Sequence, residues 1–235
     1  MLPIPALVGF VPRALLFDGD VYLEIKSRPR AGREGARFLL VLGTALGLAG
    51  ALSAIVGWAT TPDLADVRRV LAQELATLPL LQRPGPSAPQ SAALVASPWL
   101  WVAARWLCPT PLLALARLPA VPAGLFLGWL AHSLLAHVAA CLLGGRGRLS
   151  ATLGCLALAE APRALLLVPL LPPLGLAHLG IWAWVLAARF QAIRAAHAFE
   201  GWRAFWATLL PALAVGALSA LAGGVALLAA LAGLP

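Results

Sequence analysis

The sequence predicts an all-α fold: an integral membrane bundle of five transmembrane helices, with an amphipathic N-terminal helix and a partly helical outer loop. Three observations lead to this prediction. Of the 235 residues, 61% are hydrophobic and only 11% are charged, whereas roughly a quarter of the residues in a soluble domain are charged. Five apolar runs are each long enough to cross a bilayer, and arginines gather at alternate connections between them. With so few charges, the surface is expected to be covered largely by lipid.

Each expected span contains about 20 residues, the length that a helix needs to cross the hydrocarbon core. The spans are residues 38–60, 121–143, 149–171, 173–193 and 204–231. The first contains no charge, and the fifth is rich in alanine, leucine and glycine. The third and fourth contain charged side chains, which are costly in lipid and are therefore candidates for a function.

Residues 1–36 are expected to form a cytoplasmic, amphipathic N-terminal segment, and residues 37–235 the membrane domain. The N-terminal segment lacks the short apolar core of a secretory signal, so the first span is expected to remain as an anchor. The outer loop, residues 61–119, begins with Thr61-Pro62-Asp63, which is typical of a helix start. Within this loop, residues 94–118 fit an interfacial segment, a re-entrant segment or a sixth span; their prolines and arginines favour five spans over six.

Charge in the connections predicts the orientation. Six lysines and arginines precede the first span, two arginines stand in the tight turn at residues 144–148, and Arg189, Arg194 and Arg203 surround the connection before the fifth span. With five spans, all three regions lie on one side. The N-terminus is therefore expected to be cytoplasmic and the C-terminus outside, in a bacterial plasma (inner) membrane. This topology also explains the net charge of +8, so no nucleic-acid partner is expected.

Small residues recur every four positions in three of the spans. They are Gly43 and Gly47, Gly124 and Gly128, and Ala212, Gly216, Ala220 and Gly224. Such spacings let helix backbones approach closely in lipid, either within the chain or against another membrane protein. Sequences rich in alanine and glycine also produce these spacings by chance, so each set is a candidate helix-packing face.

Four short motifs occur between residues 141 and 218. They are the turn Gly144-Gly145-Arg146-Gly147-Arg148-Leu149-Ser150, the pair Ala161-Pro162, the stretch Ile181-Trp182-Ala183-Trp184, and Arg194-Ala195-Ala196-His197-Ala198-Phe199 followed by Arg203-Ala204. Together they resemble the glycine-rich basic turn, the alanine-proline pair, the tryptophan of span four and the short loop before span five of the Yip domain family. These are five-span proteins named for interaction with Ypt/Rab GTPases. The N-terminal half is similar to the family in layout only.

The resemblance implies a five-helix bundle with a cytoplasmic N-terminus. Eukaryotic members of the family are linked to membrane trafficking. This compact, arginine-rich chain looks more like the prokaryotic members, which have no settled activity, so a GTPase partner is not carried over. Glu160 and Arg163 beside the proline depart from the family pattern, as does the tryptophan-rich stretch of the outer loop.

Four ionisable side chains within the spans are candidate site residues: Glu160, Arg163, His132 and His137. Glu160 lies near the middle of its span, and Arg163 is about one turn further along the same face. Pro162 between them frees a backbone carbonyl group. The tight turn before span three places His132 at a similar depth and His137 nearer the cytoplasm. The cluster either locks helices together as a satisfied internal pair, carries protons, or binds a polar headgroup.

No catalytic motif is recognisable, so the chain is not expected to be an enzyme. Cys108, Cys141 and Cys155 are widely spaced, so we expect no metal and no cofactor. The leading interpretation is a non-enzymatic membrane scaffold or accessory subunit, whose partners are the lipid bilayer and other membrane proteins or a second copy of the chain. The alternative is a small transporter or proton- or ion-conducting protein that uses the Glu/Arg/His cluster. An intramembrane enzyme ranks third, because no second acidic or metal-binding residue converges on Glu160.

Overall fold

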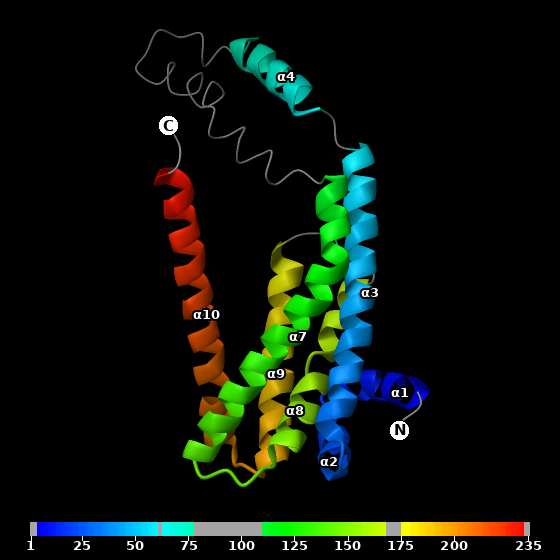
Figure 1. The fold of residues 1–235 in the computed structure, drawn as a ribbon, viewed down its shortest axis with the longest axis vertical. Coiled ribbons are helices and arrows are strands. Elements are labelled where there is room, and N and C mark those ends of the chain that lie inside the picture. Colours follow the sequence, from blue (N-terminus) through cyan, green and yellow to red (C-terminus); the bar gives the residue numbers. More distant parts are fainter. Residues whose placement is uncertain (1–3, 61–62, 78–109, 168–174, 233–235) are drawn as a thin grey trace. The chain divides into compact units, whose positions relative to one another are not determined.

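The computed structural model describes residues 4–60, 63–77, 110–167 and 175–232 (Figure 1). Every regular element in these ranges is helical, which confirms the all-α prediction for the described part of the chain. The elements are α1 (Ile4–Leu15), α2 (Gly19–Ser27), α3 (Ala31–Thr60), α4 (Leu64–Thr77), α7 (Pro111–Leu142), α8 (Leu149–Leu158), the 3-10 helix η1 (Ala161–Leu167), α9 (Gly175–His197) and α10 (Gly201–Ala232).

Among the described residues, four segments are long and apolar enough to cross a membrane: α3, α7, α8 together with η1, and α10. Each overlaps one of the predicted spans. The remaining predicted span, residues 173–193, overlaps α9, a continuous helix of 23 residues. α9 is not among the four segments, and its C-terminal half carries Arg189 and Arg194.

Two helices begin earlier than the apolar runs indicated. α3 begins at Ala31 rather than at residue 38, and α7 begins at Pro111 rather than at residue 121. The Thr110 hydroxyl accepts the Leu113 N–H at 3.2 Å, so Thr110 caps α7, and proline suits the first helical position because it has no N–H to leave unbonded. Residues 111–118, whose relation to the membrane was left open, are thus the first turns of α7. Residues 94–109 lie outside the described part of the chain.

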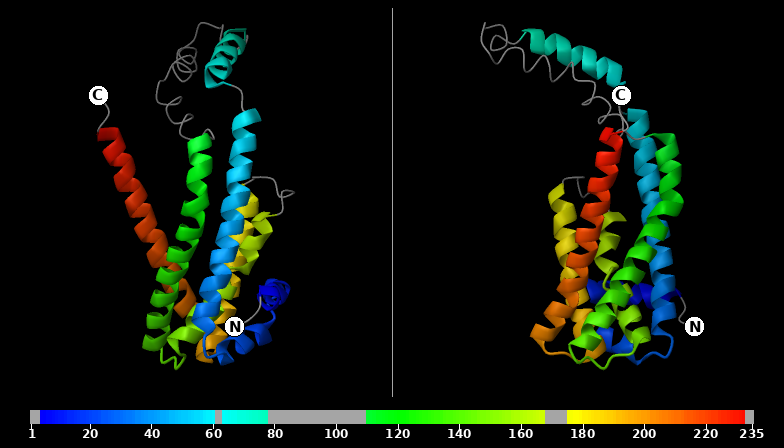
Figure 2. Two further views of the ribbon diagram at one scale, coloured as in Figure 1. Left: turned by 45° about the vertical axis from the view of Figure 1, so that its right-hand side comes forward. Right: turned by 60° about the vertical axis from the view of Figure 1, so that its left-hand side comes forward.

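The chain divides into two compact units, residues 1–47 with 119–235, and residues 48–118. In the first unit α9 is central: α2, α8, η1 and α10 all pack against it (Figures 1 and 2). In the second unit Asp63 caps α4, because its carboxylate accepts the Ala65 N–H at 2.9 Å. There the Arg117 guanidinium donates to the Gly50 carbonyl oxygen at 3.0 Å and joins the start of α7 to α3.

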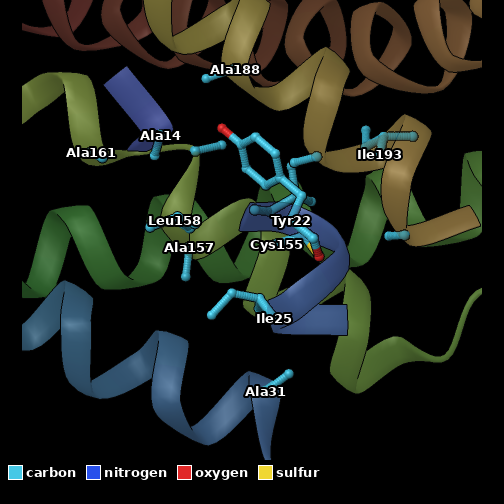
Figure 3. Close-up of a cluster of buried hydrophobic side chains, with 14 of the residues drawn as sticks. Ala14, Tyr22, Ile25, Ala31, Cys155, Ala157, Leu158, Ala161, Ala188 and Ile193 are labelled. Atoms are coloured by element: carbon cyan, nitrogen blue, oxygen red, sulfur yellow. The ribbon is translucent and has the colours of Figure 1, made fainter. Parts of the chain in front are cut away.

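The N-terminal segment contributes to the core of the first unit. Tyr22 on α2 is fully buried, and Figure 3 shows it within a cluster that includes Leu158 and Ala188. The Cys155 thiol donates to the Tyr22 carbonyl oxygen at 3.3 Å, and the Lys26 ammonium donates to the Ala195 carbonyl oxygen at 2.9 Å. Residues on both sides of the expected boundary at residues 36 and 37 therefore share one core.

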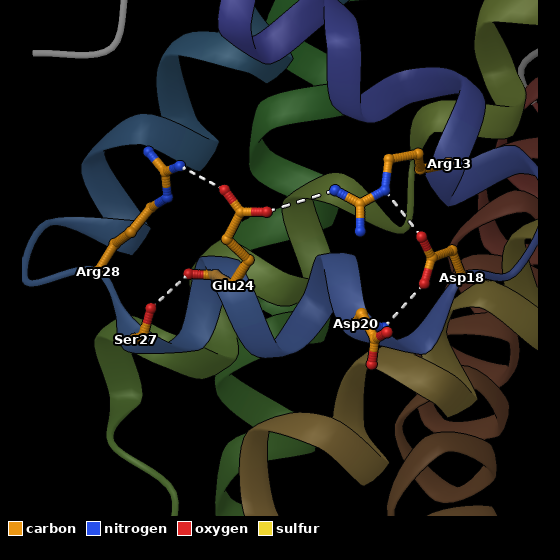
Figure 4. A network of polar contacts seen from close by, with 6 residues as sticks. All are labelled: Arg13, Asp18, Asp20, Glu24, Ser27 and Arg28. Atoms are coloured by element: carbon orange, nitrogen blue, oxygen red, sulfur yellow. Dashed lines mark hydrogen bonds and ion pairs between the residues drawn. The ribbon is translucent and has the colours of Figure 1, made fainter.

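Ion pairs join α1 and α2 at the surface (Figure 4). Asp18 accepts the Asp20 N–H at 3.0 Å, which caps α2, and it pairs with Arg13 at 2.7 Å. Glu24 lies between Arg13 and Arg28, at 3.4 and 3.0 Å. The Arg13 guanidinium holds the pKa of Asp18 below its usual value. Exposed ion pairs contribute little to stability, so the buried face of α2, rather than this network, holds the two helices in place.

Candidate functional site

The third predicted span is broken at its centre. α8 ends at Leu158, and the chain continues as a 3-10 helix from Ala161. Pro162 has no N–H to donate to the Leu158 carbonyl group, so the α-helical pattern cannot continue through it. The Arg163 N–H instead donates to the Glu160 carbonyl oxygen at 3.0 Å. A change from α to 3-10 geometry inside a span often marks a functional hinge, and here it coincides with Glu160.

Both carboxylate oxygens of Glu160 are bonded to arginines. Arg163 Nε donates to Oε2 at 2.5 Å. Arg189, on α9, donates to Oε1 through Nε at 2.9 Å and through Nη2 at 2.5 Å. Glu160 is 1% exposed and Arg189 is 8% exposed, so this ion pair is sealed inside the unit. The Arg163 guanidinium also lies over the Trp182 ring, 5.0 Å from its centroid, which shields its charge where the side chain reaches the surface.

His132 lies within electrostatic range of both Glu160 and Arg189, and its side chain is 3% exposed. In the described part of the chain, no hydrogen-bond partner reaches its Nε2 atom or the Oγ atom of the fully buried Ser133 next to it. A buried polar atom without a partner is costly, and sites of this kind are where internal water or a transferred proton is found.

His137 belongs to a different cluster, nearer the α7–α8 turn. The Gly147 N–H donates to His197 Nδ1 at 3.1 Å, so in the neutral imidazole Nε2 carries the proton. His197 Nε2 then donates to Thr152 Oγ1 at 3.0 Å, and Thr152 Oγ1 lies 3.1 Å from His137 Nδ1. The two imidazole rings are 5.3 Å apart. We call Gly147, His197, Thr152 and His137 the histidine relay.

The turn that the relay holds requires glycine. A Cβ atom at Gly145 would lie 2.5 Å from His197 Nδ1 and 2.7 Å from Phe199 Cζ. One at Gly147 would lie 2.7 Å from the Ala196 carbonyl oxygen. Gly144 has a φ of +87°, a conformation that other residues adopt at a cost. The basic glycine turn and the loop after α9, two of the motifs noted in the sequence, are thus packed against each other.

The four predicted site residues therefore divide between two places. Glu160, Arg163 and His132 lie at the helix break, and His137 lies in the relay. Sequence reasoning missed Arg189, Thr152 and His197 as site residues. Arg189 was assigned to the basic side of the membrane, although its position within a predicted span already marked it as a candidate for pairing with Glu160. No sequence signal indicated Thr152, because its role depends on two histidines brought together by folding.

The small-residue faces also differ among themselves. A Cβ atom at Gly43 would lie 2.7 Å from Pro122 Cα, so α3 and α7 approach closely there, and Gly47 is buried on the same helix. A Cβ atom added at Gly124, Gly128, Gly216 or Gly224 would have no neighbouring atom of the described residues within 4 Å. The exposed glycines, with Ala220, remain candidate contacts with other proteins. A second close approach was not predicted: Gly35 of α3 faces Gly154 and Ala157 of α8.

Comparison with known proteins places the chain in a family. The model of the Yip1 domain matches residues 13–224, which is most of the chain and extends well beyond the segment that carries the motifs. The same comparisons matched no curated protein and no solved structure. The match includes α2, the helix break and the histidine relay. With this match and four helical segments apolar enough to cross a bilayer, the chain belongs to the Yip1 domain family of helical transmembrane proteins.

Proposed function

We propose that the chain is a non-enzymatic membrane scaffold or accessory subunit. The observation that supports this most directly is the bonding of Glu160. Both of its oxygens are already engaged by Arg163 and Arg189, so the buried charge joins η1 and α9 and has no free oxygen to offer to a substrate. A satisfied buried ion pair of this kind specifies how helices meet, which is a structural task.

The exposed surface of α10 supports the same proposal. In the most apolar window of α10 only 6% of the residues are buried, against 61% for α8 with η1. Leu213, Leu218, Leu221 and Val225 of α10 are exposed, as are Gly216 and Gly224. Helices associate in lipid through such small-residue surfaces, and a scaffold needs one that is not used inside its own fold.

The proposed topology has five spans, with α9 as the fourth, a cytoplasmic N-terminus and an external C-terminus, in a plasma membrane. Arg189, the charged residue inside the predicted span 173–193, is paired with Glu160 inside the unit, which lowers the cost of placing α9 in lipid. Fusion of alkaline phosphatase, which is active only outside the cytoplasm, to the C-terminus tests this. Activity supports five spans, whereas fluorescence of a C-terminal green fluorescent protein without phosphatase activity contradicts them.

The experiment that tests the function is extraction in a mild detergent or a nanodisc, followed by mass determination of the particle. A scaffold or accessory subunit is expected to be recovered in a complex of defined composition with other membrane proteins. Recovery of the chain alone, as a monomer or a homo-oligomer, contradicts the accessory role.

A second candidate function, proton or ion transport, is favoured by one specific feature. His132 Nε2 and Ser133 Oγ have no partner in the described part of the chain, and they lie beside a broken helix, an arrangement found at transporter sites. Flux measured in liposomes with the wild-type chain and with Glu160→Gln decides between the two proposals. Loss of flux in a folded Glu160→Gln protein supports transport, and absence of flux in the wild type removes this candidate.

A further inference from the structure

One end of the first unit carries arginines that have no acidic partner. We call this the basic end, and its residues are Arg146, Arg148, Arg194 and Arg203. All four side chains are exposed, and the ion pairs found among the described residues include none of them. Glu200, the acid nearest in sequence to Arg203, is exposed and forms no ion pair with it. Arg30, Arg33 and Arg37 of the same unit are likewise in none of the ion pairs found among the described residues, whereas Arg13, Arg28, Arg163 and Arg189 are each paired with a carboxylate.

Packing fixes the position of this charge. The turn at residues 144–148 is held by the Gly147 N–H bond to His197, and its glycines lie against the end of α9. A Cβ atom at Gly144 would lie 3.8 Å from Arg203 Nη1, so the first turn of α10 reaches the α7–α8 turn. The three segments that carry these arginines, the α7–α8 turn, the end of α9 and the start of α10, are therefore held together at one end of the unit by packing contacts.

The surface beside the basic end has the composition of a bilayer interface. Trp202 is 69% exposed, with its ring 5.9 Å from Phe205 and 5.3 Å from Trp206. Tryptophan is enriched where headgroups meet acyl chains. Beyond it along α10, Leu210 and Leu213 are exposed. An apolar path thus leads away from the arginines along the helix, as the acyl chains of a bound lipid require.

We propose that the basic end is a binding site for the phosphate group of an anionic glycerophospholipid. Arg146, Arg148 and Arg203 bind the phosphate oxygens, because guanidinium groups donate paired hydrogen bonds that match a phosphate. Trp202 lies at the level of the glycerol backbone, and the acyl chains follow α10. A free phosphate ion would make no contact with this aromatic and apolar surface, whereas a lipid would cover it with its acyl chains. The occupant is therefore a lipid. The inference depends on the bundle spanning a membrane and not on the scaffold role.

Native mass spectrometry of the full chain released from nanodiscs tests the proposal. The nanodiscs contain equal amounts of phosphatidylglycerol and phosphatidylcholine, and the readout is the ratio of the two lipids retained per protein. The wild type is expected to retain phosphatidylglycerol selectively. The triple variant Arg146→Gln/Arg148→Gln/Arg203→Gln is expected to lose this preference by about tenfold or more, since each basic group near an anionic surface contributes about a kilocalorie per mole.

A matched control separates a site from a general field of positive charge. Arg30→Gln/Arg33→Gln/Arg37→Gln removes the same charge from the N-terminal part of the unit and should leave the preference unchanged. Arg146→Lys/Arg148→Lys/Arg203→Lys keeps the charge but removes the paired donors, and should lose part of the preference. Equal losses in the two glutamine triples, or an unchanged preference in the first, overturn the proposal. So does displacement of phosphatidylglycerol by millimolar inorganic phosphate, which would make the site one for soluble anions.

Discussion

A carboxylate in the apolar interior of a helical bundle is stable only where its charge is balanced and its oxygens are bonded. Glu160 meets both conditions through Arg163, from its own segment, and Arg189, from α9. The two arginines are not equivalent. Arg189 is buried and makes two hydrogen bonds, whereas the side chain of Arg163 is 21% exposed and makes one. At the scale of single residues, the Glu160–Arg189 pair is therefore expected to dominate.

Replacement of Arg189 by methionine leaves a buried carboxylate with one partner. Loss of one member of a buried ion pair costs about 3 to 5 kcal/mol, so Arg189→Met should lower the free energy of unfolding by about that amount. Arg163→Met should cost less, because Glu160 keeps both hydrogen bonds from the more deeply buried Arg189. The double variant Glu160→Gln/Arg189→Met should recover part of the loss. Thermal unfolding in detergent measures all three, and equal effects of the two single arginine variants would argue against this ranking.

Gly145 and Gly124 offer a matched pair of glycine-to-alanine substitutions. A methyl group at Gly145 collides with the His197 and Phe199 rings, and overpacking of this kind costs about 1 to 3 kcal/mol. At Gly124, inside α7, the space is open, and alanine should stabilise the helix by about 0.5 to 1 kcal/mol. Midpoints of thermal unfolding should therefore move in opposite directions. A parallel decrease at both positions would mean that Gly124 faces a partner or a neighbouring helix after all.

For the helices, the sequence predicts the type of element and its approximate position. It predicts less well where each helix begins and where its geometry is interrupted. Hydropathy marks the part of a helix that lipid covers, so it missed the first turns of α3 and α7, which carry charges or prolines. Pro162 frees a backbone carbonyl group in the third span, but that span was predicted as continuous, whereas the structure shows α8 ending at Leu158, four residues before the proline. In α9, the charge of Arg189 is balanced by Glu160, a residue of another segment. Pairing between segments is set by folding and is not visible in a local window.

The histidine relay makes the α7–α8 turn sensitive to pH. His197 lies at the end of α9, beyond residues 173–193, and burial, with His137 and Lys26 nearby, lowers its pKa from 6.5 to about 4. Because the folded pKa lies below the unfolded one, this histidine supports the fold fully above about pH 6.5. Its contribution declines as the pH falls towards 4, since a proton on Nδ1 displaces the Gly147 N–H bond.

We therefore expect the free energy of unfolding to be lower at pH 4.5 than at pH 7, by up to about 3 kcal/mol. The midpoint of thermal unfolding should decrease accordingly. The variant His197→Gln cannot take up this proton, so its unfolding should depend less on pH over the same range. His137→Gln serves as the control for the neighbouring ring. If His197→Gln keeps the full pH dependence of the wild type, another group is responsible for it.

At the scale of the whole molecule, the sequence separated residues 1–36 from the membrane domain because the charge content changes there. The structure shows α2 within the core of the first unit, where Val21, Tyr22 and Ile25 are buried. A segment of mixed charge can still bury one face, and the three-residue spacing of its apolar side chains was available in the sequence. Which helices that face would meet was not available, because α8 and α9 lie more than a hundred residues away.

Tyr22 provides the test of this arrangement. Tyr22→Ala removes a fully buried ring from the contact of α2 with α8 and α9, and deletion of a buried aromatic side chain costs about 3 to 5 kcal/mol. Tyr22→Phe should be neutral or slightly stabilising, because the hydroxyl group has no partner in the described part of the chain. Leu23→Ala, on the exposed side of the same helix, is the control. If the N-terminal helices complete the core of the bundle, Tyr22→Ala should unfold at a clearly lower temperature than Tyr22→Phe and Leu23→Ala. If they were a separable cytoplasmic segment, Tyr22→Ala would leave the thermal unfolding of the bundle unchanged.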